Sequence, residues 1–193
     1  MANALAITTV TEALRLRLDA AVKQAVTGAV AVAKRPEATD GQSESMVTIF
    51  LYRIAPNAAL RNADLPTRDA DGRPVRRPTA ALDLHYLLCF TGDEQQLVPQ
   101  RMLGRAVSSL HSAPALSRAE IEVATQGEAW LANSDLMDEV ESVKFCQSPL
   151  SLDDLSKAWS VFFQIPYQLT TGYEASVVLI EADVAARVPL QVQ

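Results

Sequence analysis

The sequence predicts an α+β fold, in which a mixed, mostly antiparallel β-sheet is flanked by helices. Three segments with a two-residue apolar period carry this prediction: Met46–Tyr52, Thr79–Phe90 and Tyr167–Glu181. Between them lie segments with apolar residues at three- and four-residue spacing, which is typical of helices that cover a sheet. A chain of 193 residues is long enough to bury a sizeable core, so residues 1–193 are expected to form a single domain.

The segment Thr79–Phe90 is expected to lie in the middle of the sheet. The residues at even positions from 82 to 90 are all apolar: Leu82, Leu84, Tyr86, Leu88 and Phe90. At the odd positions, Asp83 and His85 are followed by Leu87 and Cys89. Because its second half is apolar on both sides, that half is predicted to be covered on both faces.

The two other strands have different characters. Met46–Tyr52 is rich in β-branched and aromatic residues and predicts a buried strand. Tyr167–Glu181 alternates until Val178 and Ile180 make its end apolar on both faces. Its 15 residues are well beyond the usual strand length and predict a strand that projects past its own sheet. Residues 183–193 are expected to form a mobile tail.

The apolar repeat over Ile7–Ala25 predicts the first helix. Thr9 and Glu12 have capping-box spacing, so this helix is expected to begin near Val10. It is expected to end around Gly28–Lys34.

Two further helices are expected later in the chain. One covers Met102–Leu110 and begins near Pro99, because proline is not tolerated deep inside a helix. Gly104 lies in its middle and predicts a close approach to another backbone. The other begins at Ser151 and buries a stripe within Leu152–Phe162.

Residues 115–141 carry conflicting signals. Ser117–Glu120 resembles a capping box, whereas Glu120–Ala124 alternates like a strand, and we predict a strand for the second piece. A short helical turn is expected in Ser134–Val140, followed by a short strand around Val143–Phe145.

Composition argues against several functional classes. The net charge is −6, whereas binding to nucleic acid needs a basic surface. The sequence contains no apolar stretch long enough for a membrane span and no secretory leader, so a cytoplasmic protein is expected. Both cysteines, Cys89 and Cys146, are expected to be buried thiols. No nucleotide, zinc or calcium motif occurs, so we predict no cofactor and no metal.

The connection Arg53–Ala80 is long for a compact domain and is basic within an acidic protein. It contains six arginines and three aspartates: Arg53, Arg61, Arg68, Arg73, Arg76 and Arg77, with Asp64, Asp69 and Asp71. Asp71-Gly72 is a tight-turn signal, which indicates a small hairpin. The connection is either a solvated surface loop or a contact surface for an acidic partner.

Catalytic signals are weak. The chain has only two histidines, His85 and His111, so any histidine-dependent triad must use one of them. Asp83 and His85 share a strand face, and a small hydrolase-like enzyme that uses them is one alternative. No nucleophile motif accompanies the pair, so a structural role at a sheet surface or interface is favoured. A generic adaptor that dimerises is a further alternative.

Four blocks of this sequence resemble one known family. They are Ile49–Ile54 with Asn57 and Leu60–Asn62; Arg77-Pro78 leading into Ala81–Leu88; Leu103–Ala106 through Leu110-His111 and Pro114; and Leu155–Trp159, Tyr167–Thr170 and Tyr173–Glu181. The family is the N-terminal domain of the cap proteins of extracellular contractile injection systems, and the resemblance covers residues 5 to 182. Thr79 and Thr170 are mild departures from it. Some members carry a further C-terminal domain.

The resemblance implies a phage tail-terminator-like protein with a structural role and no catalysis. A homohexamer would close the distal end of a phage-tail-like particle, where its partners are the inner-tube protein and the last layer of sheath protein. The chain would assemble in the cytoplasm and then become part of the particle. The interface residues that we select on this basis are Arg53, Asn57, Arg61, Asn62, Arg76, Arg77, Asp83, His85 and Tyr173.

Overall fold

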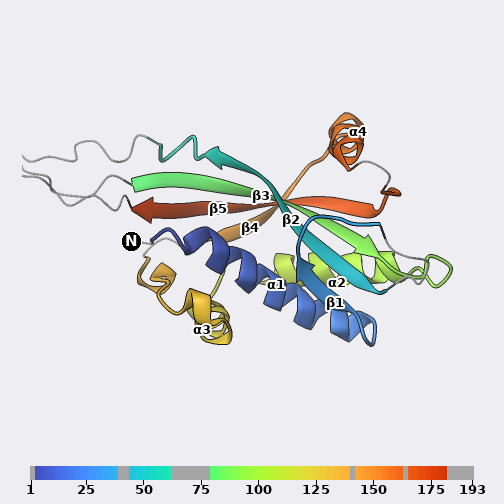
Figure 1. Cartoon of the computed structure of the whole chain (residues 1–193), viewed down its shortest axis with the longest axis horizontal. Coiled ribbons are helices and arrows are strands. Elements are labelled where there is room, and N and C mark those ends of the chain that lie inside the picture. Colours follow the sequence, from blue (N-terminus) through green and yellow to red (C-terminus); the bar gives the residue numbers. More distant parts are fainter. Residues whose placement is uncertain (1–2, 39–43, 62–78, 140–141, 163–164, 182–193) are drawn as a thin grey trace, which may run out of the picture.

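The computed structural model describes residues 3–38, 44–61, 79–139, 142–162 and 165–181 (Figure 1). Its α-helices are α1 (Ala6–Ala25), α2 (Val98–Ser112), α3 (Arg118–Gly127) and α4 (Leu152–Val161), with short 3-10 turns η1 (Ala129–Leu131) and η2 (Leu136–Asp138). Its strands are β1 (Val30–Ala33), β2 (Met46–Pro56), β3 (Thr79–Thr91), β4 (Lys144–Ser148) and β5 (Leu169–Glu181). They form one 5-stranded sheet in the order β1-β2-β3-β5-β4. Only the β1–β2 pair is parallel, so the predicted mixed, mostly antiparallel sheet is confirmed.

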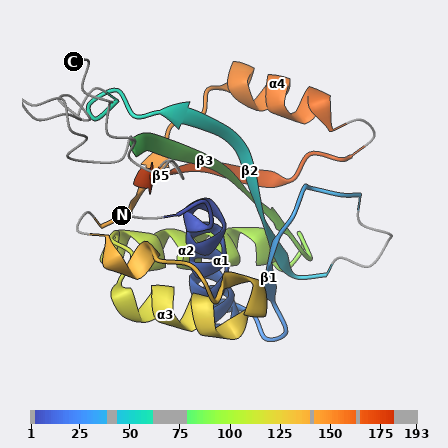
Figure 2. The same ribbon diagram turned by 60° about the vertical axis from the view of Figure 1, so that its left-hand side comes forward.

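Strand β3 lies in the middle of the sheet, as predicted. Its even residues from Leu84 to Phe90 are buried in the main core, against α1 and α2. Leu87 and Cys89 are buried on the opposite face, in a second cluster with Phe162. Helices α1, α2 and α3 cover the first face and α4 lies on the second (Figure 2). We call these the helix-rich face and the α4 face.

One end of the sheet contains only three strands. Strand β4 pairs only with Gly172–Ser176, and β1 pairs only with Met46–Ile49. Beyond them, β2, β3 and β5 continue together (Figure 1). We call this region the three-stranded end and define it as Arg53–Pro56, Thr79–Leu84 and Val177–Glu181. Strand β5 therefore extends past β4, but β3 pairs with it from Leu169 to Glu181, so the prediction that it projects past its own sheet is wrong.

A buried arginine fastens the helix layer to the sheet. Arg17 of α1 donates from Nε and Nη2 to the Glu120 carboxylate of α3, at 2.6 Å each. It also donates to the carbonyls of Ala113 and Ala115, and its guanidinium lies 5.5 Å from the Phe145 ring. The Arg17 side chain is only 6% exposed, so this one cation joins α1, the segment between α2 and α3, α3 itself and β4.

Helix α3 replaces the strand that alternation predicted over Glu120–Ala124, and that prediction is wrong. Ser117 forms a complete capping box with Glu120, which starts the helix at Arg118. Ile121 and Ala124 are buried at helical spacing, whereas Val123, the residue that made the pattern look alternating, is 59% exposed. A satisfied helix N-terminus therefore outweighed a short alternation.

The first helix begins earlier than predicted, at Ala6, because Thr9 does not cap it. The Thr9 hydroxyl donates to the Leu5 carbonyl at 2.9 Å and lies 2.7 Å from the Ser134 hydroxyl. Glu12 forms an ion pair with Arg15. The helix ends at Ala25, and β1 follows Gly28, whose φ of 81° allows the chain to reverse. The sequence pattern did not reveal β1.

Three local expectations are also wrong. Cys146 is exposed because β4 lies at the edge of the sheet, whereas Cys89 is buried and burial raises the pKa of its thiol to about 11. No atom lies within 4 Å of the position that a Gly104 side chain would occupy, so this glycine permits no close approach. The stripe expected on α4 is wrong at Leu152, which is 86% exposed, whereas Phe162 is buried and Ala158 and Trp159 pack beside it against the sheet.

The short turn expected near Ser134–Val140 is present as η2, and the strand after it is β4. The predicted hairpin at Asp71-Gly72 and the tail at 183–193 lie outside the described residues. Over the part of the chain that is described, no helix combines the length and the apolar character that a membrane crossing requires.

We predict that Arg17→Ala lowers the free energy of unfolding by about 2–4 kcal/mol, because two carbonyls and the Glu120 carboxylate lose their donor. Burial alone would raise the pKa of Glu120, but hydrogen bonds from Arg17 and Ser117 lower it below its ordinary value of 4.5. This contribution is therefore present above about pH 4.5 and is lost at lower pH. Urea unfolding at pH 7 and pH 3.5 measures both effects.

The matched control is Lys157→Ala, which removes an ion pair with Asp153 whose two side chains are 73% and 72% exposed. This control should change the free energy of unfolding by less than about 0.5 kcal/mol. Equal effects of the two variants would contradict the role of Arg17.

Candidate interaction surface

Three segments that are distant in sequence meet at a hydrogen-bonded node at the border of the three-stranded end. The Asp83 carboxylate oxygen Oδ1 accepts a hydrogen bond from Asn57 Nδ2 at 2.8 Å and from Ser176 Oγ at 2.6 Å. Asn57 Nδ2 also lies 3.2 Å from Ser176 Oγ. The node therefore joins the end of β2 to β3 and β5.

Asn57 also shapes the chain where it leaves β2. Its backbone N–H donates to the Ala81 carbonyl at 2.8 Å. Its side-chain oxygen accepts from the N–H groups of Ala59 at 3.1 Å and Leu60 at 3.0 Å, which is a turn held by a single amide. The next residue, Arg61, is exposed and donates its N–H to the Asn57 carbonyl at 2.9 Å. The node thus fixes the direction in which the basic connection begins.

A second polar group lies next to the node on the α4 face. His85 Nδ1 is 3.5 Å from the Glu174 carboxylate on β5, and Tyr52 places its ring 6.2 Å from the imidazole. Arg53 is opposite His85 in the β2–β3 ladder and is exposed. The ladder register shifts between Leu51 and Arg53, so Tyr52 is an extra residue in β2 at this point.

This arrangement does not form a hydrolase triad among the described residues. Asp83 bonds to Asn57 and Ser176, whereas His85 pairs with Glu174, so the two proposed partners are each satisfied by other groups. No cluster of His, Cys, Asp or Glu in the described ranges could hold a metal ion. The geometry is that of a fixed polar surface.

The structure places the predicted interface residues in different environments. Arg53, Asn57, Asp83 and His85 lie together at one end of the sheet. Tyr173 is only 4% exposed and belongs to the main core, so its side chain is not available to a partner, and that prediction is corrected. Asn62, Arg76 and Arg77 lie outside the described residues. Ser176 and Glu174 were missed as site residues, because only the β3–β5 register brings them to Asp83 and His85.

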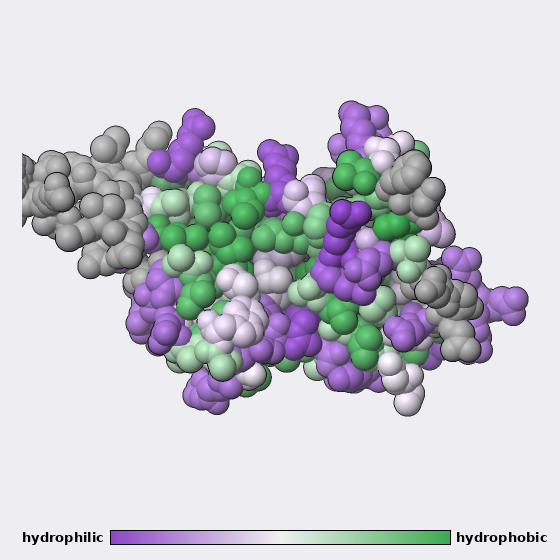
Figure 3. Space-filling model, viewed as in Figure 1, coloured by the Kyte–Doolittle hydropathy of each residue, from purple (hydrophilic) through white to green (hydrophobic). Residues whose placement is uncertain are grey.

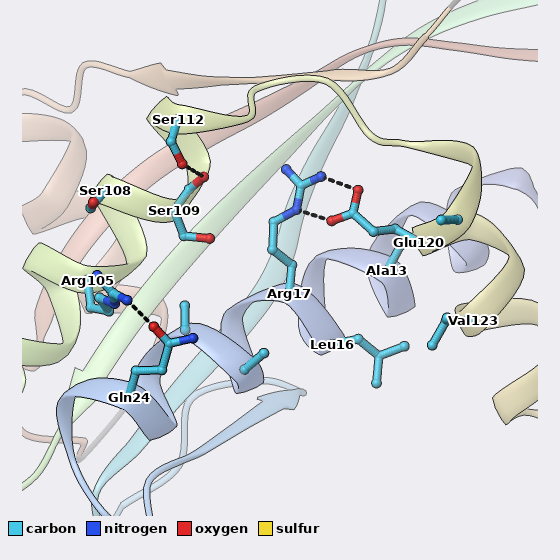
Figure 4. A pocket seen from close by; sticks show the side chains of 13 residues that line it. Ala13, Leu16, Arg17, Gln24, Arg105, Ser108, Ser109, Ser112, Glu120 and Val123 are labelled. Carbon is cyan, nitrogen blue, oxygen red and sulfur yellow. Dashed lines mark hydrogen bonds and ion pairs between the residues drawn. The ribbon is translucent and has the colours of Figure 1, made fainter.

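A groove with a volume of about 520 Å³ lies elsewhere, between α1, α2 and α3 (Figure 4). Ala13, Leu16 and Val123 contribute to its lining, and the Arg17–Glu120 pair crosses it. Arg105 donates to Gln24 in the same groove. The groove belongs to the helix layer, on the opposite side of the sheet from Asp83 and His85.

Two solved structures have a similar fold. One is the sheath/tube terminator of the extracellular contractile injection system PVC in the extended state, with a TM-score of 0.62 and 19% identity, covering 97% of this chain and 62% of that chain. The other is the tube-terminating cap of the anti-feeding prophage, with a TM-score of 0.60 and 19% identity, covering 95% of this chain and 58% of that chain. The chain therefore has the fold of contractile-injection-system terminators and spans about three fifths of their length.

The family model for the Pvc16 N-terminal domain matches residues 9–193, and the chain belongs to this family. This match confirms the resemblance that the four sequence blocks carried. No curated protein was found to be similar to the chain.

We predict that Asp83→Ala destabilises the chain by about 1–3 kcal/mol, because the Asn57 amide and the Ser176 hydroxyl lose a shared acceptor. Asp83→Asn keeps an oxygen in the same place and should restore most of this loss. Thermal unfolding of the two variants measures the difference. If the Asp83→Ala variant unfolds at the same temperature as the unchanged chain, the node contributes nothing to the stability of the fold.

Proposed function

We propose that this chain is a structural cap, or tail terminator, that closes the distal end of the inner tube of a contractile injection system. The observation that carries the proposal is the family match over residues 9–193, together with a fold shared with two terminator structures. Residues 1–193 act as a single cap domain. The functional unit is a homohexameric ring that also contacts the last sheath layer.

A cap must end a polymer, so it needs one surface that fits the ring below and another that offers no further site. The two sides of this molecule differ in the required way. Helices α1, α2 and α3 cover one face of the sheet, whereas the other face carries the polar side chains of Arg53, Asp83 and His85 beside the part that α4 covers. A single chain thus presents two chemically distinct sides to its neighbours.

The interface that we assign to the tube ring or to a neighbouring cap subunit begins at the node and includes the basic connection. Its residues are Arg53, Asn57, Arg61, Asn62, Arg76, Arg77, Asp83 and His85. Three features support this assignment: Arg53 and Arg61 are exposed, Asn57 joins the first residues of the connection to Asp83, and the connection is basic in a chain of net charge −6.

Assembly is expected to follow from this role. The chain is made in the cytoplasm, adds to a completed tube and sheath, and then remains part of the particle. Its partners are further copies of itself, the inner-tube protein and the sheath protein, with no nucleic acid and no cofactor.

Replacing Arg61 and Asn62 together by alanine should leave the fold intact but abolish capping, because both side chains lie in the assigned interface. Thermal unfolding checks the fold, and electron microscopy of particles made with the variant checks capping. Arg118→Ala is the matched control, since Arg118 is an exposed arginine of the helix layer and should cap normally. Normal particles from the double variant would refute the assignment.

His85→Ala separates the structural role from the hydrolase alternative. We expect this variant to assemble particles, because His85 is one of eight assigned interface residues and the loss of one imidazole leaves the other contacts in place. If the unchanged protein hydrolyses a test substrate and His85→Ala loses that activity while particle assembly is unchanged, the enzyme alternative is favoured.

Native mass spectrometry of the protein, alone and with its tube protein, tests the ring. We expect six copies, about 125 kDa for a chain of 20.9 kDa, at least when the tube protein is present. A species of two copies under both conditions would favour the dimerising adaptor.

A further inference from the structure

The three-stranded end has an apolar strand edge that nothing in the described residues pairs with. Residues Val177–Glu181 of β5 bond to β3 on one side, whereas β4 stops at the level of Ser176. The open segment reads Val-Val-Leu-Ile-Glu, with no proline and no charge before its last residue. Such an edge is a template for a strand from another chain unless something covers it.

The helix-rich face beside this edge is also incompletely covered. Ile54, Leu82 and Ile180 share that face, Ile54 is 46% exposed, and the other two are partly buried. Figure 3 shows apolar surface gathered over this part of the molecule. An added strand would therefore gain backbone hydrogen bonds from the edge and a place for one row of apolar side chains.

Residues 184–192 have the sequence of such a strand. Val184, Ala186, Val188, Leu190 and Val192 occupy every even position, whereas Arg187, Pro189 and Gln191 occupy odd positions. This alternation is typical of a strand with one buried face. At about 3.3 Å per residue, the segment is roughly 30 Å long, which exceeds the roughly 17 Å of the open edge.

The local sequence does not favour a return of this segment to its own edge. A hairpin after Glu181 would need a tight turn, and such turns rely on glycine or asparagine at positions of positive φ. Residues 182–185 are Ala-Asp-Val-Ala, and no glycine follows Gly172 anywhere in the sequence. The segment is thus better suited to continue outward to the edge of another copy.

Pro189 determines which edge of the added strand can accept no further strand. Successive residues of a strand direct their backbone N–H groups to opposite sides, so odd and even residues bond to different neighbours. If the even residues bond to the β5 edge, Pro189 lies on the outer side, where its missing N–H blunts further strand addition. One strand would be accepted and no second strand would follow, as a terminator requires.

We propose that residues 184–192 of one copy add as a strand to the Val177–Glu181 edge of a second copy. Donor and acceptor are different surfaces, so the contact is head-to-tail and can close a ring of copies. This inference rests on the proposed function for the ring itself, and it identifies the contact that holds neighbouring copies together.

The test is a disulfide between copies in a Cys146→Ser background, in which the remaining Cys89 is buried. Ile180→Cys is combined with Val188→Cys or with Leu190→Cys, positions that the proposal places on one face. Protein purified from cells that also make the tube protein is oxidised and run on a denaturing gel. We expect a ladder of bands at multiples of the mass of one chain, which collapses to a single band on reduction.

Ile180→Cys with Gln191→Cys is the matched control, which should give no ladder because residue 191 lies on the opposite face.

A cross-link only within one chain would overturn the proposal, because the segment would then cover its own edge. No ladder, or an equal ladder from the control, would also overturn it.

As a second measurement, Val188→Asp with Leu190→Asp should reduce the native mass to one chain, whereas Gln191→Asp should leave the oligomer intact. If the aspartate pair still forms rings that cap particles, strand donation is wrong and the proposed function stands. If the unchanged chain never joins particles, the proposed function itself fails.

Discussion

The two-sided burial of one half of β3 is the constraint on which the rest of the structure depends. Where both faces of this strand are apolar, helices must cover both sides, and α1, α2 and α4 do so. Where Asp83 and His85 replace apolar residues on one face, α4 no longer covers the sheet and a polar surface is left. The change of pattern within one strand therefore divides the molecule into a packed half and a half that is available for contacts.

The sequence predicted the elements whose pattern has a single explanation. β3 and β5 are long and carry an apolar residue at almost every second position, and α2 begins at Val98, next to the proline that was expected to mark its start. Prediction failed where two patterns competed or where the decisive contact is distant. Glu120–Ala124 alternates but is helical, because Ser117 caps it and Arg17, more than a hundred positions away, holds Glu120. Thr9 was read as a cap, but its hydroxyl bonds to the preceding turn.

The candidate site was only partly predictable for the same reason. Asn57 and Asp83 were selected from the sequence, and the structure joins them directly. Ser176 and Glu174 were not selected, because only the register of β3 against β5 brings them to Asp83 and His85. Tyr173 was selected but is buried, since its parity on β5 points it to the core beside Tyr86. Strand register, which the alternation of a single strand does not specify, thus decides which residues form the surface.

These features support a protein that works through the surfaces it offers to neighbouring subunits. The most direct test is electron microscopy of particles assembled with and without this chain, with the lengths of tube and sheath measured. A cap that ends both polymers should give a narrow length distribution when it is present and uncontrolled tube and sheath lengths when it is removed. Equally narrow distributions in the two samples would contradict the account.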